Sequence, residues 1–282
     1  MGTGPVGIGC GAPFHVHGDL RIVRVGGGDA RRWLHDIVTS DVATLGTGEA
    51  RVGLLLGPTG RIRAAFATVV EGDDVLLAQS TDQPSVADHL RPYVLSADVR
   101  LTTVEDAVLV SVPVAVAPAP SWRPSLLPSG AGATALVPVA DLASLRARAI
   151  EAGCDEVTVA DVERERVLAG IARFPVDLDA ESLPAEAAWD VARIDRTKGC
   201  FVGQETVAKV ANAGHPTRVV LAATILGGAA PGDPVLAGEA TVGVVTSAVG
   251  DATGLTAALV RVRWDARATT LRTASGAAVS PR

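Results

Sequence analysis

The sequence predicts an α+β fold followed by a small C-terminal β-barrel. In the first two thirds of the chain, apolar residues at helical spacing alternate with short apolar runs that are typical of strands. From residue 219 onward only short strand-like runs remain, and Gly-rich turns separate them, which is typical of a small barrel. With 282 residues the chain can bury one large core or two to three smaller ones.

The first half of the chain predicts a strand, a helix and a meander. Polar and apolar residues alternate over residues 19–25, which predicts a strand. A short helix is expected after Asp29, because four apolar residues recur there at helical spacing: Trp33, Leu34, Ile37 and Val38. Three apolar runs separated by turn signals predict strands over residues 51–56, 62–70 and 75–78. A helix over 84–90 and a strand over 99–104 complete this unit.

The second half begins with a loop and ends in strands. Residues 113–132 are rich in proline and are predicted to be a loop or linker. Helical spacing and glycine stops predict helices over residues 141–152, 161–169 and 203–212. A short helix with start signals at Ser182 and Pro184 carries Glu186 and Trp189. The tail strands are expected over residues 219–225, 241–245 and 255–262.

The composition argues against several classes of protein. Apolar residues make up 48% and charged residues 20% of the chain, so its bulk is not disordered. The net charge of -6 argues against direct nucleic-acid binding. The most apolar stretch, 107–119, is interrupted by prolines and is too short for a membrane span, and residues 1–13 lack the pattern of a signal peptide. We therefore expect a cytoplasmic protein with no membrane partner.

The cysteines and histidines predict no metal site. Cys10, Cys154 and Cys200 are odd in number, far apart and without a CxxC pair, so neither a disulfide framework nor a thiolate site is expected. His15 and His17 would lie on the same side of a strand and could bind a metal together. No third ligand is in view, so no metal ion is expected.

The clearest chemistry lies in the segment Lys198–Lys209, whose sequence is Lys-Gly-Cys-Phe-Val-Gly-Gln-Glu-Thr-Val-Ala-Lys. It holds both lysines of the chain, in which the other 23 of the 25 basic residues are arginines. Two glycines bracket Cys200, and a helix is expected to begin behind Gly203. A neighbouring ammonium group and a helix N-terminus both lower the pKa of a thiol, so Cys200 is the candidate catalytic thiol and Lys198 the residue that tunes it. The alternative for Cys200 is a small buried residue in a turn.

This segment resembles the signature of the YgfZ-type folate-binding proteins, which are relatives of the glycine-cleavage T-protein, an aminomethyltransferase. The signature is K-G-C-[aromatic or Leu]-x-G-Q-E-x-x-x-[Arg or Lys]. All eight specified positions are met, by Lys198, Gly199, Cys200, Phe201, Gly203, Gln204, Glu205 and Lys209. Further similarity lies in residues 28–42, 54–62, 91–95 and 183–186. The Pro-rich middle and the tail match only in general character.

The resemblance implies a three-lobed, T-protein-like arrangement of ferredoxin-like α+β modules and a barrel around a central hole that holds tetrahydrofolate or a one-carbon derivative. The implied folate-binding region spans residues 1–212 as two interleaved modules, with the meander module over about 46–112. The implied barrel domain spans 213–282. The motif would lie beside the cavity, and the implied folate-binding residues are Glu186, Gly199, Phe201, Gly203, Gln204, Glu205 and Arg218.

Two of these assignments have alternatives. A carboxylate such as that of Glu186 can accept paired hydrogen bonds from the amino-pyrimidine edge of a pterin, but a solvated helix acid is the other interpretation. Arg218 follows the motif helix, where relatives carry basic residues that can meet the folate tail. Trp189 is expected to be a core residue rather than a residue that stacks on the pterin.

The chain departs from the aminomethyltransferases at one strand. In those enzymes the strand after the turn at Gly60 carries an Asp pair, one member of which assists the reacting folate nitrogen. This chain places Ala64 and Ala65 there, and no acid lies between Gly60 and Val70. Without a carboxylate the site lacks the group that would steer protonation during methylene transfer, so glycine cleavage is not expected and enzymatic activity is left open.

The resemblance implies a tetrahydrofolate-binding accessory protein that supports assembly or repair of iron-sulfur proteins, with Cys200 as nucleophile or redox thiol. Its partners would be iron-sulfur client enzymes, including those of tRNA modification. Two alternatives stay open: a folate-dependent aminomethyl or one-carbon transferase, and a folate-binding module without cysteine chemistry. A compact ammonium fits a tight Gly-Cys turn better than a planar guanidinium, so Lys198 is expected to resist replacement by Arg.

Overall fold

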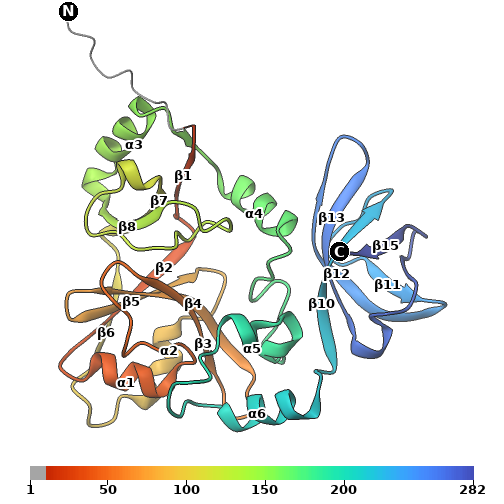
Figure 1. Cartoon of the computed structure of the whole chain (residues 1–282), viewed down its shortest axis with the longest axis horizontal. Coiled ribbons are helices and arrows are strands. Elements are labelled where there is room, and N and C mark those ends of the chain that lie inside the picture. Colours follow the sequence, from red (N-terminus) through yellow and green to blue (C-terminus); the bar gives the residue numbers. More distant parts are fainter. Residues whose placement is uncertain (1–10) are drawn as a thin grey trace, which may run out of the picture.

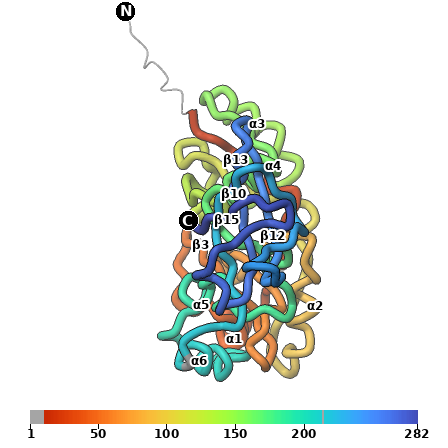
Figure 2. The backbone as a smooth tube through the Cα atoms, turned by 90° about the vertical axis from the view of Figure 1, so that its right-hand side faces the viewer, coloured from red at the N-terminus to blue at the C-terminus, as the bar shows by residue number. Residues whose placement is uncertain are grey.

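The computed structural model describes residues 11–282, apart from the side chain of Ala213, and contains two open sheets with helices and one closed barrel. The predicted α+β fold with a C-terminal barrel is therefore confirmed. Figure 1 shows the two open sheets one above the other, with the barrel beside them. From the barrel side, Figure 2 shows the barrel in front of the other elements, between α3 (Leu142–Glu151) and α6 (Gln204–Ala213).

An antiparallel five-stranded sheet of order β3-β4-β5-β2-β6 forms the first core. Its strands are β2 (Leu20–Gly26), β3 (Ala50–Leu56), β4 (Ile62–Glu71), β5 (Asp74–Ser80) and β6 (Arg100–Val104). Leu34 of α1 (Ala30–Ile37) and Leu90 of α2 (Val86–Leu90) pack with the strand residue Val23 in one buried cluster. The short 3-10 helix η1 (Arg91–Tyr93) follows α2. The predicted meander and the helix after Asp29 are confirmed.

A second sheet of order β8-β7-β1-β9 was not expected from the sequence. Its strands are β1 (Pro13–Val16), β7 (Ala107–Val112), β8 (Ala133–Pro138) and β9 (Asp155–Glu156). Strands β7 and β8 are neighbours in space, although the Pro-rich stretch separates them in sequence and obscures the pairing. Between them lies Trp122, which is fully buried and donates from Nε1 to the Val70 carbonyl at 2.9 Å. The Pro-rich stretch therefore packs between the two sheets.

Of the two predicted helices in this part of the chain, α3 covers this sheet and α4 (Val159–Leu168) lies against the barrel. Leu145 of α3 packs with the strand residues Phe14 and Val110. Helix α4 begins at Thr158, which forms a capping box with Asp161. Two short 3-10 helices lie next to these strands: η2 (Val114–Val116) follows β7, and η3 (Val139–Asp141) joins β8 directly to α3.

The short helix expected around Glu186 and Trp189 is two pieces rather than one. The 3-10 helix η4 (Pro184–Ala187) is followed by α5 (Trp189–Ala192), and Ala188 between them has a left-handed φ of 55°. This conformation interrupts the run of helical backbone hydrogen bonds and turns the chain between Glu186 and Trp189.

The tail closes into a barrel of order β10-β13-β12-β11-β14-β15. Its strands are β10 (Arg218–Leu226), β11 (Pro234–Ala237), β12 (Ala240–Gly250), β13 (Leu255–Arg263), β14 (Leu271–Thr273) and β15 (Ala278–Pro281). The 3-10 helix η5 (Trp264–Ala266) follows β13. Strands β11, β14 and β15 were not predicted, since each has only three or four residues.

A buried ion pair around Asp177 joins α4 to the barrel. Asp177 lies 2.7 Å from Arg166 of α4, and the exposed fractions of the two side chains are 0% and 7%. The same carboxylate accepts hydrogen bonds from the barrel residues Ser247, at 2.7 Å, and Thr246, at 2.6 Å. Because a buried charge is costly without its partner, this group of contacts holds β12 against α4.

A second buried ion pair joins β13 to the segment before the motif. Arg261 contacts Glu186 at 2.8 Å and Asp179 at 2.6 Å. Its side chain is only 10% exposed, and that of Glu186 is 4% exposed. One guanidinium therefore pairs with two carboxylates, Glu186 of η4 and Asp179 from the segment before it.

A disulfide and the lengths of the helices bear on what the sequence led us to exclude. Cys154 is disulfide-bonded, which corrects the expectation that the cysteines form no disulfide, whereas Cys10 lies outside the described residues. Among the described residues, no helix is long and apolar enough to cross a membrane.

Replacement of Arg261 by Met is expected to lower the free energy of unfolding by about 3–5 kcal/mol, because Glu186 would stay buried without its cation. Arg263 on the same strand is a matched control, since its side chain is 55% exposed and pairs with Asp265 on the surface. Arg263→Met is expected to change stability by less than about 0.5 kcal/mol. Urea unfolding of both variants measures the difference, and equal losses would contradict a specific role for Arg261.

Candidate functional site

The motif helix α6 begins where two glycines allow close contact with the β3–β4 turn. Gly203 has a left-handed φ of 83°, and a Cβ there would lie 2.6 Å from the Gly57 carbonyl oxygen and 3.0 Å from Gly60 Cα. A Cβ on Gly60 would in turn lie 2.7 Å from Thr206 Cβ. Both positions therefore require glycine for α6 to dock on this turn.

Lys198 anchors the start of the motif to the end of α1. Its Nζ donates to the backbone carbonyls of His35 and Val38, and it lies 3.5 Å from the Ser40 carbonyl oxygen. These carbonyls end a helix, where a cation is favourable. Burial lowers the pKa of Lys198 to about 8, although nearby carboxylates, among them Asp36, favour the charged form. Among the described residues no hydrogen bond joins this ammonium to Cys200, so its tuning role stays a prediction.

Cys200 is a free and exposed thiol in the loop before α6. The next residue, Phe201, is 8% exposed and packs in a core cluster with Trp189 and Phe174. The alternation turns the aromatic ring into the core and leaves the thiol at the surface. Cys200 is therefore not the buried turn residue that the sequence left as an alternative.

The other predicted folate-binding residues are scattered rather than gathered around one space. Glu186 accepts from the Leu183 backbone at 3.1 Å with Oε1 and from Arg261 with Oε2, so both its oxygens are engaged. Glu205 is exposed and pairs with Lys209 at 2.6 Å, and Arg218 is exposed at the start of β10. None of the predicted folate-binding residues is among those that line the two large cavities: Glu186, Gly199, Phe201, Gly203, Gln204, Glu205 and Arg218. Their contact with folate stays a prediction.

Two adjoining cavities lie between the sheets and the segment that carries α5. Their volumes are about 900 Å³ and about 570 Å³. They share four lining residues, Val52, Ala67, Leu126 and Arg193. Aromatic side chains line the smaller cavity, among them Phe66, Phe174 and Trp189. Together the cavities offer room for a ligand larger than a single ring system.

Arg193 is the cation in the wall that the two cavities share. Its guanidinium stacks 4.1 Å from the centre of the Trp189 ring. Among the described residues it has neither an ion pair nor a side-chain hydrogen bond, and burial lowers its pKa to about 10. The sequence analysis missed Arg193, and the one available signal was its position four residues after Trp189.

Unsatisfied buried polar atoms gather at these cavities. Four buried side-chain atoms lack a hydrogen-bond partner among the described residues: Asp19 Oδ1, Ser40 Oγ, Thr68 Oγ1 and Arg173 Nε. Ser40 lines the larger cavity, and Asp19 and Arg173 line the smaller one. Buried polar groups are normally paired, so these three atoms are the ones in the cavity walls that a polar ligand or water could satisfy.

The two alanines at the transferase Asp positions face different surroundings. Ala65 lines the smaller cavity, and its backbone amide donates to the Gln83 side chain at 3.0 Å. Ala64 is fully buried in the core under α1. Strand β4 therefore presents no carboxylate to the cavity, whose acidic residues come from elsewhere in the chain: Asp19, Asp82 and Glu163.

The fold is similar to that of the glycine cleavage system aminomethyltransferase T from Bartonella henselae. The TM-score is 0.79 and the sequence identity 19%, over 96% of this chain and 84% of that chain. No family model and no curated protein matches the sequence. At this identity the likeness shows the fold alone, and function has to be argued from the site.

Gly203→Ala is expected to destabilise the protein by about 1–3 kcal/mol through its left-handed conformation alone, with a further loss from contact with the β3–β4 turn. Gly199 is the matched control within the motif, since a Cβ there meets nothing within 4 Å. Gly199→Ala is expected to be neutral or stabilising by less than about 1 kcal/mol. Urea unfolding measures the free energy of unfolding of both variants, and equal values would contradict the role of Gly203 in docking α6.

Lys198→Arg is expected to destabilise the protein by about 1–3 kcal/mol, because a planar fork cannot replace a compact ammonium among the carbonyls that end α1. Lys209 is the control, since its side chain is 72% exposed and pairs only with Glu205. Lys209→Arg is expected to change stability by less than about 0.5 kcal/mol. Thermal and urea unfolding measure the stability of both variants. Equal losses would mean that Lys198 has no special role and that lysine is rare in this chain only because of its overall composition.

Proposed function

We propose that this chain is a tetrahydrofolate-binding accessory protein of the YgfZ type that supports assembly or repair of iron-sulfur proteins. The observation that carries the proposal is Arg193, a cation in the wall shared by two cavities, which stacks on Trp189 and has no ion pair with any residue of 11–282. The fold likeness to an aminomethyltransferase and the complete motif around Cys200 support it.

The cavity residues fit tetrahydrofolate in size, charge and polarity. Arg193 would pair with a carboxylate of the glutamate tail, because it is the cavity cation without a partner of its own. Arg166 and Arg173 line the smaller cavity but are paired with acidic residues. Trp189, Phe66 and Phe174 give apolar surface to a ring system. Tetrahydrofolate, when bound, supplies a carrier for one-carbon units.

Cys200 would be the working thiol of the proposed function. It is exposed, and two nearby residues are fixed: Lys198, two positions before it, binds the end of α1, and Phe201, directly after it, packs in the core. A thiol held by such neighbours is accessible to a client protein without a change of fold. The clients would be iron-sulfur enzymes, including those that modify tRNA, and the protein would act in the cytoplasm.

The finer organisation belongs to the same proposal. A folate-binding region over residues 1–212 and a barrel domain over 213–282 would form three lobes of ferredoxin-like modules and barrel around the ligand. The transferase alternative is disfavoured by Ala65, which leaves the cavity wall of β4 without a carboxylate. Formation of methylene-tetrahydrofolate from an aminomethyl donor by the purified protein would favour that alternative instead.

Tetrahydrofolate is expected to raise the Tm of the wild type, since a ligand that binds only the folded state adds about 2.7 kcal/mol to the free energy of unfolding at 100 times its Kd.

Arg193→Gln is expected to weaken tetrahydrofolate binding by about tenfold or more, because a charge-assisted hydrogen bond contributes about 1.5–3 kcal/mol. Arg263→Gln is the control and should leave the Kd unchanged, since the Arg263 side chain is 55% exposed, pairs with Asp265 and lies outside the walls of both cavities. Calorimetric titration gives each Kd. An unchanged Tm in the wild type would contradict folate binding.

The role of Cys200 is tested by complementation. In a strain without its own protein of this type, the wild-type chain is expected to restore the activity of an iron-sulfur enzyme that methylthiolates tRNA, and Cys200→Ala is not. Folate affinity of Cys200→Ala should equal that of the wild type, because Cys200 lies outside the cavity walls. Equal rescue by both chains would contradict the thiol role and favour a folate-binding module without cysteine chemistry.

A further inference from the structure

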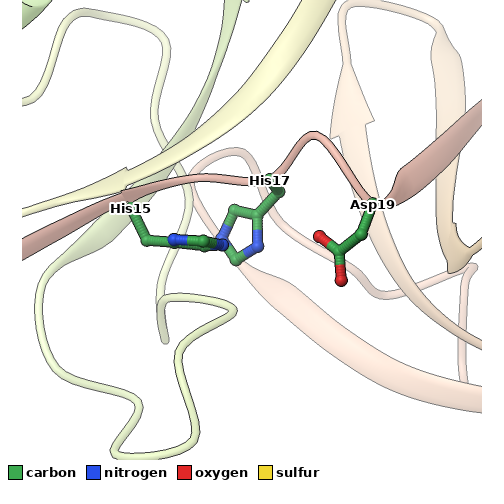
Figure 3. A group of neighbouring side chains, drawn as sticks. All are labelled: His15, His17 and Asp19. Atoms are coloured by element: carbon green, nitrogen blue, oxygen red, sulfur yellow. The ribbon is translucent and has the colours of Figure 1, made fainter. Parts of the chain in front are cut away.

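Three side chains with metal-binding atoms gather where β1 leads into β2. His15 and His17 alternate along the chain and lie on the same side of it, and Asp19 follows two residues later. One ligand atom from each of the three lies within 4.8 Å of the others. Figure 3 shows His17 between His15 and Asp19, with the Asp19 carboxylate directed toward His17.

The two imidazoles are held by hydrogen bonds that leave one nitrogen of each ring available. His15 Nδ1 lies 2.8 Å from the Val157 carbonyl oxygen, which only accepts, so Nδ1 carries the proton and Nε2 the lone pair. His17 Nε2 lies 2.7 Å from Ser111 Oγ, and this hydroxyl also contacts Thr134. Partners of this kind on the far nitrogen orient histidine ligands in metal sites.

Asp19 supplies an oxygen that the fold leaves unsatisfied. Its Oδ1 is buried and has no hydrogen-bond partner among the described residues. No ion pair of Asp19 with a basic side chain, including either imidazole, occurs in residues 11–282. A buried carboxylate oxygen without a partner is costly, and a cation bound at this place would satisfy it.

We propose that His15, His17 and Asp19 bind a divalent first-row transition-metal ion of the zinc type. Two imidazoles and one carboxylate form a donor set that such ions favour over Mg²⁺ or Ca²⁺. The sequence analysis missed the third ligand because Asp19 lies beyond the end of β1, where strand periodicity no longer places it.

The position of the cluster gives this ion an open side. His17 and Asp19 line the smaller cavity, whereas His15 is buried behind them against Val157. Three arginines line the smaller cavity: Arg166 is ion-paired with Asp177 and Arg173 with Asp82, whereas Arg193 stacks on Trp189. An ion held by three protein ligands would keep a coordination position for water or for a ligand in the cavity.

The proposal is tested with tag-free protein that has been dialysed against a chelator and then titrated with Co²⁺ and Zn²⁺ without folate. One Co²⁺ per chain is expected, with the visible absorption of a low-coordinate site, and Zn²⁺ should displace it. Asp19→Asn keeps the shape of the side chain and should weaken binding by about tenfold or more. His17→Ala should abolish the absorption, and circular dichroism checks that both variants fold.

Asp82→Asn is the matched control, since Asp82 lines the same cavity but pairs with Arg173, and it should leave metal binding unchanged. Absence of a stoichiometric site in the wild type would overturn the proposal, as would equal affinity of Asp19→Asn and the wild type. Because the titration contains no folate, its failure would leave the folate proposal untouched, and failure of folate binding would leave the metal site untouched.

Discussion

The whole arrangement depends on charges that are buried where the barrel meets the rest of the chain. Arg166 with Asp177, and Arg261 with Glu186, are withdrawn from water on both sides of each pair. Such pairs add little net stability compared with apolar contacts, but they are intolerant of displacement. A shifted barrel would leave Glu186 without Arg261, and would take the hydrogen bonds of Ser247 and Thr246 away from Asp177. The segment between α4 and the motif supplies three of the carboxylates: Asp177, Asp179 and Glu186. The barrel therefore positions the same segment that carries the cavity residues Trp189 and Arg193.

The motif around Cys200 separates into positions that build the fold and one that stays available. Gly203 permits close contact with the β3–β4 turn, Lys198 binds the end of α1, and Phe201 fills a core. Each of these tasks has a physical reason that involves no ligand. The thiol of Cys200 is free and exposed, and among the described residues it has no such task in the fold.

Elements with strong local patterns could be predicted from the sequence, and elements defined by their partners could not. Helix α1 and the meander follow from apolar spacing and turn residues. The pairing of β7 with β8 could not be predicted, because the Pro-rich stretch between them has the composition of a linker. The motif was likewise accessible to sequence reasoning, whereas the exposure of the Cys200 thiol was left open by the sequence and is given by the structure. The sequence could not show that Arg193 lacks an ion pair among the described residues, because this depends on where the acidic side chains lie in the folded chain. Glu186 was recognised as important, but its partner Arg261 lies 75 residues away in the sequence.

The double engagement of Glu186 has a thermodynamic consequence. Any ligand that donates hydrogen bonds to the buried carboxylate of Glu186 has to compete with Arg261 for it. Its apparent affinity would be reduced by the free energy with which the barrel is docked, and by linkage its binding would loosen the barrel by the same amount. Occupancy of such a site would then be reported at a distance, as a change in how freely the barrel moves against the two sheets.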